Sequence, residues 1–192
     1  MIRTNLLNLP EIKMPPGYRL RTYQENDNWH WANIINSSFG GDRTDADTRE
    51  QIVDRPEFES TGLFFSTYQD QPVGTACAWK WNGADEKEVG QLHMVGVMPE
   101  HSGYRLGKWV SLAVLYYHRQ QGFKCAVLGT DDFRLPAIKT YLNLDFMPIY
   151  VEDDQPERWQ VIFEKLKLPF ISDSVDQVRT ALSENIITKI YQ

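Results

Sequence analysis

One stretch of the chain alternates between hydrophobic and polar residues, and three later stretches are rich in apolar residues, so the pattern predicts four β-strands. The first stretch covers residues 18–23, with the sequence YRLRTY. The other three cover residues 62–68, 73–81 and 89–98, and short turn-forming segments separate them. Alternation over such lengths is typical of half-buried strands. Because the connections are short, we expect the last three strands to pair in antiparallel fashion.

Apolar residues at helical spacing predict helices on either side of these strands. One helix begins after Asn26 or Asp27, both of which are good N-caps, and ends at Phe39 before two glycines. A second, shorter helix is expected over residues 44–55. A third is expected over residues 106–121, where the apolar residues fall on one stripe.

The rest of the chain up to residue 168 completes the pattern. We expect a buried strand at residues 124–130, a helix at 136–144, and strands at 147–151 and 158–166. The order is then strand, two helices, three strands, helix, strand, helix and two strands. This order predicts a mixed α/β fold with a central, mostly antiparallel sheet flanked by helices. Its strand-helix-strand crossover should be right-handed.

One domain accounts for most of the chain, because 192 residues leave no room for a second full domain. We place this domain at residues 1–168 and expect residues 169–192 to form a C-terminal helical extension. Ser174 and Gln177 match a capping box, and apolar residues follow at helical spacing, so this helix should be amphipathic. We expect its apolar face to dock on its own domain, with a homodimer contact as the alternative.

Composition and charge narrow the class of protein. Hydrophobic residues make up 42% of the chain and charged residues 24%, as in ordinary globular proteins. No apolar run approaches the ~18 residues of a membrane-spanning helix, and the N-terminus lacks a secretory signal, so we expect a cytoplasmic protein without a membrane partner. The formal net charge of -6 argues against nucleic acid as a partner. Cys77 and Cys125 lie in apolar stretches, where we expect buried thiols and neither a disulfide nor a metal site.

The stretch from residue 92 to residue 108, LHMVGVMPEHSGYRLGK, is the most informative part of the sequence. A strand there runs into a glycine-containing turn and then into a helix, an arrangement whose free backbone N–H groups suit an anion such as phosphate. The alternative is that Gly103 and Gly107 only make a tight turn. The stretch is not a Walker loop, because Trp109 follows Gly107 and Lys108, and it carries no dinucleotide-binding pattern.

Two segments of the chain resemble the GNAT N-acetyltransferase superfamily. The family's acetyl-coenzyme A loop has the pattern Arg/Gln-x-x-Gly-x-Gly/Ala after Val-x-Pro-Glu. Here V-M-P-E begins at Val97, and the loop pattern falls on the run Ser102, Gly103, Tyr104, Arg105, Leu106 and Gly107. Ser102 replaces the usual Arg or Gln, and Arg105 replaces the middle glycine.

The second segment, residues 130–148, is similar to the family helix that ends in Tyr-x-x-x-Gly-Phe. Tyr141 occupies the tyrosine position, Asp145 and Phe146 occupy the Gly-Phe positions, and Arg134 replaces a frequent asparagine. The resemblance covers about residues 17–165 and includes bacterial, mycothiol-synthase-like members.

The resemblance implies a GNAT-like acyl-CoA N-acyltransferase fold and the use of acetyl-CoA (coenzyme A) as co-substrate. It implies an N-acetyltransferase in which an amine attacks directly within a ternary complex. The pantetheine arm would pair with Val95, Gly96 and Val97, with Gly96 suited to a bulge and an N–H near Val95 stabilising the oxyanion. Tyr141 would be the general acid, unless it is simply a core tyrosine. The residues expected to hold the cofactor in the loop and the following helix are Ser102, Gly103, Tyr104, Arg105, Leu106, Gly107, Lys108 and Arg134.

The residue that accepts the proton of the amine is less clear. His93 shares strand parity with Gln91, Val95 and Val97, and an imidazole with a pKa near 6.5 suits the task, although a core histidine is the alternative. Glu88 is a rival. The acceptor, a small-molecule or peptide amine, carries no readable motif. Two other functions stay open from the sequence: a non-catalytic acyl-CoA-binding regulatory domain, and a phosphate-binding protein unrelated to acyl transfer.

Overall fold

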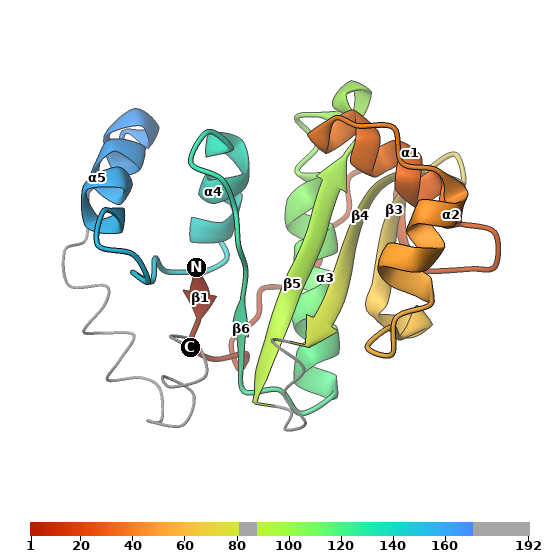
Figure 1. Cartoon of the computed structure of the whole chain (residues 1–192), viewed down its shortest axis with the longest axis horizontal. Helices are drawn as coiled ribbons and strands as arrows, with labels where there is room; N and C mark the ends of the chain where they lie inside the picture. The colour runs from red at the N-terminus through yellow and green to blue at the C-terminus, as the bar shows by residue number, and fades with distance from the viewer. Residues whose placement is uncertain (81–87, 171–192) are drawn as a thin grey trace.

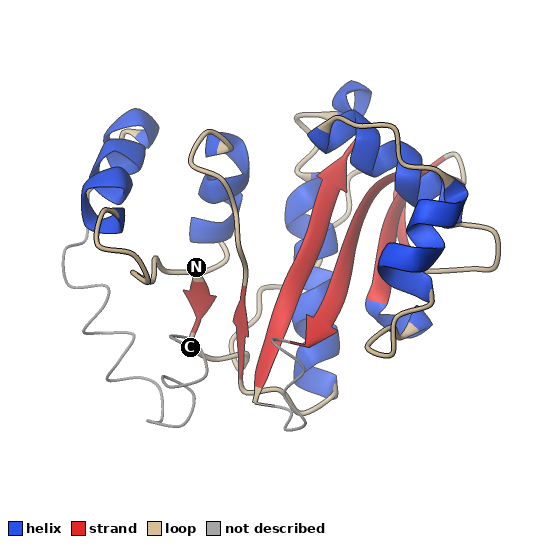
Figure 2. Cartoon of the chain, viewed as in Figure 1, coloured by secondary structure: helices blue, strands red, loops and turns tan. Residues whose placement is uncertain are grey.

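The computed structural model describes residues 1–80 and 88–170, and a sheet forms its centre. The sheet has six strands in the order β1-β6-β5-β4-β3-β2 (Figure 2). Their bounds are β1 (Ile2–Arg3), β2 (Tyr18–Thr22), β3 (Leu63–Tyr68), β4 (Gln71–Lys80), β5 (Val89–Val97) and β6 (Cys125–Val127). All neighbouring strands pair in antiparallel fashion except β5 and β6, which are parallel. The prediction of a mixed, mostly antiparallel sheet is therefore confirmed.

Helices cover both faces of the sheet (Figure 1). The α-helices are α1 (Asn28–Phe39), α2 (Asp45–Thr48), α3 (Leu106–Gln120), α4 (Leu135–Leu142) and α5 (Gln155–Leu166). Shorter turns are the π-helix η1 (Arg49–Val53) and the 3-10 helices η2 (Ser60–Gly62) and η4 (Pro99–His101). The expected helix at residues 44–55 thus consists of α2 followed by η1.

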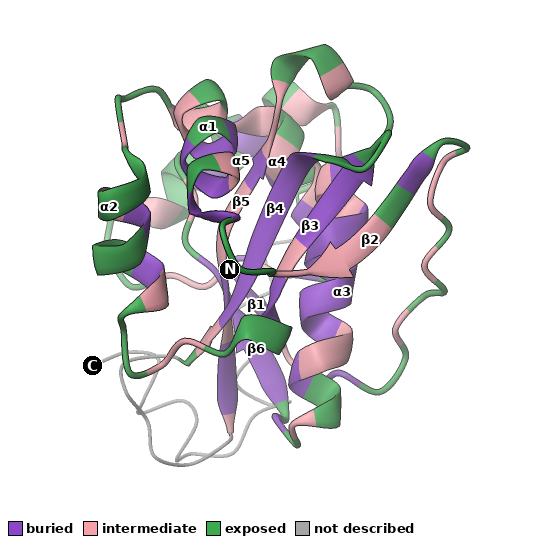
Figure 3. Ribbon diagram, turned by 90° about the vertical axis from the view of Figure 1, so that its right-hand side faces the viewer, coloured by how far each residue is buried: buried purple, intermediate pink, exposed green. Residues whose placement is uncertain are grey.

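Each face of the sheet has its own hydrophobic core, because successive side chains of a strand point to opposite faces. On the face covered by α1, here called the α1 face, Ile34, Ile35 and Cys77 are buried together. On the opposite face, here called the α3 face, Ala76, Ala78 and residues of α3, α4 and α5 are buried together. Figure 3 shows the buried strands at the centre with exposed residues on the outer sides of the helices.

The expected strands at residues 147–151 and 158–166 are wrong. Residues 158–166 lie in the helix α5, and Met147 forms only an isolated bridge with Ile2. The apolar residues at 159, 161 and 163 alternate as in a strand, which misled the sequence interpretation. In the structure Trp159 and Phe163 are buried whereas Val161 is 46% exposed, as helical spacing requires.

The N-terminal segment completes the sheet, which the sequence interpretation missed. Strand β1 pairs with β6, and the chain then crosses α3, where the Tyr116 hydroxyl donates a hydrogen bond to the Pro10 carbonyl at 3.2 Å. Arg3 is almost fully buried, and its guanidinium donates to the Leu144 carbonyl and to the Asp145 carboxylate, at 2.5 and 2.7 Å. The segment after α4 is therefore held by the N-terminal strand.

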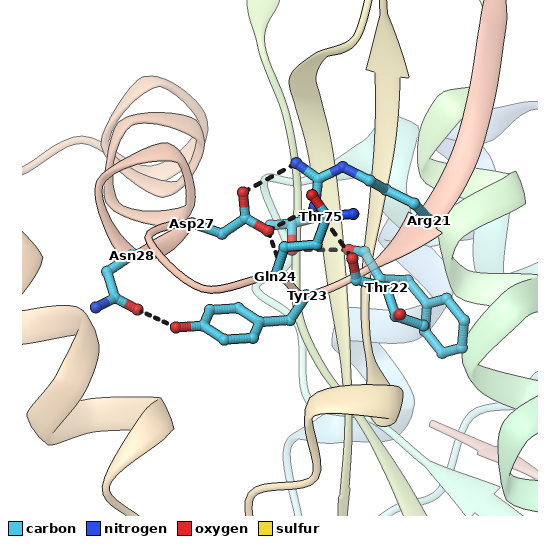
Figure 4. Close-up of polar contacts among 8 residues, drawn as sticks. Arg21, Thr22, Tyr23, Gln24, Asp27, Asn28 and Thr75 are labelled. Atoms are coloured by element: carbon cyan, nitrogen blue, oxygen red, sulfur yellow. Dashed lines mark hydrogen bonds and ion pairs between the residues drawn. The ribbon is translucent and has the colours of Figure 1, made fainter.

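An ion pair fixes the start of α1 against the sheet (Figure 4). Arg21 of β2 donates to both carboxylate oxygens of Asp27, at 2.5 and 2.9 Å, and its guanidinium lies over the Phe65 ring. Asp27 is the N-cap residue, as expected, but its carboxylate accepts a hydrogen bond from the Gln24 amide instead of a helix amide. Because Asp27 is buried, this ion pair ties β2 to α1.

Cys77 and Cys125 are buried in β4 and β6, as the apolar sequence around them predicted. Burial raises the pKa of both thiols to about 12. No helix within residues 1–80 and 88–170 is long and apolar enough to span a membrane. The expected C-terminal amphipathic helix, including Ser174 and Gln177, lies outside the described residues.

Candidate functional site

A cavity opens where β5 and β6 separate. The two strands pair only between residues 89–91 and Cys125–Val127, although β5 continues to Val97. Beyond this short ladder lies a cavity of about 440 Å³. Its walls are residues 91–95 of β5, residues 129–131 after β6, Arg134, Ala137 and Tyr141 of the α4 segment, and Phe39 of α1.

This cavity connects the two faces of the sheet. Tyr141 and Leu92 belong to the core of the α3 face, whereas Phe39 and Met94 pack against the core of the α1 face. The His93 ring stacks on Trp79, with 5.7 Å between ring centroids, and Trp79 also packs on the α1 face. The cavity is therefore bordered by residues from both cores, between β5 and β6.

An extra residue in β5 shapes the wall of the cavity. Cys77 pairs with His93 and Thr75 pairs with Gly96, so two steps along β4 match three steps along β5. Met94 adopts the left-handed conformation with φ 50°, and it forms the bulge that the sequence interpretation assigned to Gly96. Gly96 serves close packing instead, because a Cβ atom there would lie 2.9 Å from the Ser38 Oγ.

The extra residue also changes which side chains share a face. Leu92 and Val95 both pack against the α3-face core, whereas His93 and Met94, which lie between them, pack on the α1 face. The expectation that His93 shares a face with Val95 and Val97 is therefore wrong, because one inserted residue reverses the alternation.

The loop before α3 presents free amides. After η4, Gly103 has φ 88° and Arg105 has φ 59°, and the helix begins at Leu106. The backbone N–H groups of residues 103–107 donate no hydrogen bond to any group in the described part of the chain. Such amides, at the positive end of the helix dipole, are a binding site for anionic groups.

Tyr141 and His93 line the cavity, and burial shifts the pKa of each. Tyr141 is 7% exposed, and burial raises its pKa to about 12 against a smaller opposing effect of Arg134. Burial lowers the pKa of His93 from its ordinary value of 6.5, because desolvation disfavours the charged imidazolium. At neutral pH the cavity therefore holds a protonated phenol and a neutral imidazole.

Comparison with known proteins identifies the family. Residues 28–146 match the model of the Acetyltransferase (GNAT) family, which is more than half of the chain. The chain belongs to this family.

Curated GNAT relatives include the mycothiol acetyltransferase of Nocardia farcinica, 32% identical over 151 residues, which are 75% of this chain and 50% of that protein. The mycothiol acetyltransferase of Thermomonospora curvata is 28% identical over 144 residues, which are 72% of this chain and 47% of that protein. The chain spans about half the length of these curated relatives.

Solved structures show the same GNAT fold. The aminoglycoside N-acetyltransferase AAC(6')-Iy in complex with CoA has a TM-score of 0.55 and 19% identity, with 69% of this chain and 90% of that chain covered. The ribosomal-protein-S18-alanine N-acetyltransferase from Escherichia coli has a TM-score of 0.56 and 12% identity, with 69% and 79% covered. The expected GNAT-like fold is confirmed.

Most of the residues predicted from the GNAT resemblance lie around the cavity or at the loop. Of the loop residues, Ser102 uses its amide within η4, and Leu106 has a buried side chain, so only its backbone is accessible. The Tyr104 ring packs on Tyr18, with 5.0 Å between centroids, and the Lys108 ammonium lies over the Trp109 ring.

Two further predicted residues, Glu88 and Arg134, lie away from the loop amides. Glu88, the rival base, lies at the opposite end of β5, where its carboxylate is 3.4 Å from the Lys124 ammonium. Arg134 lines the cavity and stacks on Phe39, so it is separate from the loop amides. The sequence interpretation missed Phe39 and Asp131 as cavity residues, and no local motif marks either of them.

Proposed function

We propose that this chain transfers an acetyl group from acetyl-CoA to an amine by direct attack within a ternary complex. The observation that carries the proposal is the position of the free amides of residues 103–107 at one end of β5, with a cavity through the sheet beside the same strand. These amides fit a diphosphate, and a narrow cavity fits an extended arm. The CoA-bound relative of the same fold supports this assignment.

Backbone groups of β5 and the loop would hold acetyl-CoA, which supplies an acetyl group activated as a thioester. Beyond Gln91 the edge of β5 that faces β6 has no strand partner among the described residues, so the backbone of Val95, Gly96 and Val97 would pair with the arm there. On the other edge, Gly96 and Val97 pair with Thr75 and Gly74 of β4. Residues 102–108 would hold the diphosphate. An N–H at Val95 would donate to the thioester carbonyl and to the oxyanion that forms on attack, an interaction worth about 100- to 1000-fold in rate in other enzymes that stabilise an oxyanion.

Tyr141 acts as the general acid in this proposal. Its pKa of about 12 keeps the phenol protonated throughout the neutral range, so it can donate its proton to the departing thiolate. Desolvation of the departing thiolate would raise the pKa of its thiol in the same direction, which keeps the gap between the two pKa values from widening. His93, neutral and facing the cavity, accepts the proton of the attacking amine.

The test is Tyr141→Phe, assayed by release of free thiol from acetyl-CoA with a panel of amines. We expect turnover to fall by about 10- to 1000-fold, because a general acid is lost, with an unchanged affinity for acetyl-CoA. Tyr116→Phe is the matched control, because its hydroxyl bonds to Pro10 at the surface. Equal turnover of wild type and Tyr141→Phe contradicts the assignment, and a wild type that binds no acetyl-CoA in calorimetry contradicts the function itself.

A further inference from the structure

The Arg134 guanidinium lines the cavity and lies over two aromatic rings. Its Cζ lies 4.1 Å from the centroid of Phe39 and 5.1 Å from that of Phe133. Phe39 ends α1, whereas Phe133 and Arg134 precede α4, so the stack bridges two walls of the cavity. A guanidinium stacked in this way is fixed in orientation before any ligand arrives.

The hydrogen bonds of Arg134 leave one edge of the guanidinium available. Its Nε donates to the Asp131 carboxylate at 2.8 Å, whereas neither Nη group has an acceptor among the described residues. The Arg134 side chain is mostly buried, and that of Asp131 is 59% exposed. Asp131 therefore fixes the side of the guanidinium that bears Nε, and the two Nη groups are left for a ligand.

Arg134 is also the only cationic side chain among the described residues that line the cavity. Asp131 is the only charged side chain beside it, and the neighbouring His93 is neutral at neutral pH, since burial lowers its pKa. A planar guanidinium with two free N–H groups in a partly desolvated place matches the geometry of a carboxylate.

We propose that Arg134 selects acceptor amines that carry a carboxylate, such as amino acids. This inference rests on the proposed acetyl transfer and names its substrate class. Acetyl-CoA would occupy the side of the α3 face, where the loop amides and Tyr141 lie. The acceptor would enter from the α1 face, with its carboxylate on Arg134 and its amine toward His93.

The experiment compares amino acids with the amines that remain after removal of the carboxylate, for example L-leucine with isopentylamine, in the thiol-release assay. We expect wild type to prefer the amino acid, and Arg134→Gln to lower kcat/KM for the amino acid by about 10- to 100-fold more than for the amine. Arg134→Lys should retain part of the preference, because it keeps the charge but not the planar fork. Lys139→Gln, an exposed change in α4, which follows Arg134 directly, is the matched control and should leave the preference intact.

Several outcomes overturn the inference. If Arg134→Gln lowers kcat/KM equally for both kinds of acceptor, or raises the KM for acetyl-CoA with an unchanged preference, then Arg134 acts in cofactor binding or in folding and not in acceptor selection. If wild type binds acetyl-CoA but acetylates no member of the panel, binding of N-acetyl-L-leucine and of N-isopentylacetamide to the CoA complex is measured by calorimetry. Equal or undetectable binding of the two then refutes carboxylate selection, whereas absent binding of acetyl-CoA itself refutes the proposed function.

Discussion

Arg3 is the residue whose replacement should destabilise the fold most clearly without touching the site. Its side chain is 4% exposed, and it donates hydrogen bonds to the carbonyl oxygens of Leu144, Asn5 and Asn8 as well as to Asp145. In Arg3→Met the Asp145 carboxylate, 78% exposed, can be hydrated, so its loss of a partner costs little. The cost comes from the carbonyl oxygens, above all the buried one of Leu144.

The expected loss of stability follows from these bonds. Leaving a buried acceptor without a donor costs about 1–3 kcal/mol, whereas the exposed Asp145 carboxylate adds little to the loss. We expect the free energy of unfolding to fall by about 3 kcal/mol, which lowers Tm by about 6–12 °C for a chain of this length. Urea unfolding followed by tryptophan fluorescence measures the first quantity, and thermal unfolding the second.

Arg19→Met is the matched control for this measurement. Arg19 pairs with Asp70 at 3.7 Å, but both side chains are exposed, so the same substitution should cost less than about 1 kcal/mol. The reasoning is refuted if Arg3→Met and Arg19→Met lower the free energy of unfolding by the same small amount. It is supported if only Arg3→Met lowers it strongly while the slope against urea is unchanged.

Three further predictions concern the site, the packing of α1 and the core. Burial lowers the pKa of His93, and the neutral imidazole is the proposed base, so the acidic limb of the wild-type kcat/KM profile should lie below pH 6.5. This limb should disappear in His93→Ala. If the limb persists in that variant, His93 is not the base. Gly96→Ala should lower the free energy of unfolding by about 1–3 kcal/mol in urea titrations, because its Cβ would press on Ser38, whereas Gly129→Ala has no close neighbour and should cost less. Burial lowers the pKa of His118 from 6.5 to about 4, so between these pH values the unfolded state binds a proton that the folded state does not. The free energy of unfolding should therefore fall by up to ~1.4 kcal/mol per pH unit as the pH drops from 6.5 toward 4. This slope should be smaller in His118→Gln.

Local signals explain why the centre of the fold could be predicted and its edges could not. Strands β3, β4 and β5 follow one another with short connections, so alternation and turn residues determine both the strands and their pairing. The position beside β6 is filled by Ile2 and Arg3, more than 100 residues away in sequence, as the pairing of Ile2 with Val127 shows. A strand of two residues is too short to show a periodic pattern, so β1 could not be recognised. The apolar pattern of α5 instead predicted a strand that does not exist.

For the candidate site, the orientation of the residues along β5 could not be predicted from the sequence. Tyr141 and His93 both face the cavity, as the resemblance and the strand pattern led us to expect, but the sequence around Met94 gives no sign of an extra residue. A bulge needs only one residue in a left-handed conformation, and a methionine there is an unusual choice. Because of this one extra residue, His93 and Val95 point to opposite faces of the sheet. The imidazole then lies on the α1 face, from which an acceptor would enter.

Arg105 and Asp145 stand at positions where the resemblance to the family leads us to expect glycine, and the structure shows both with a left-handed backbone, which glycine adopts readily. Both residues are left-handed, with φ 59° and φ 57°, a conformation that costs a non-glycine residue about 1–2 kcal/mol. At Asp145 the carboxylate accepts a hydrogen bond from buried Arg3, which offsets part of that cost. At Arg105 the described residues offer no such partner, yet α3 still begins at Leu106 and the amides around it stay free. The backbone of the loop, and with it the proposed diphosphate site, therefore depends on how Leu106 and the rest of α3 pack against the sheet more than on glycine at position 105.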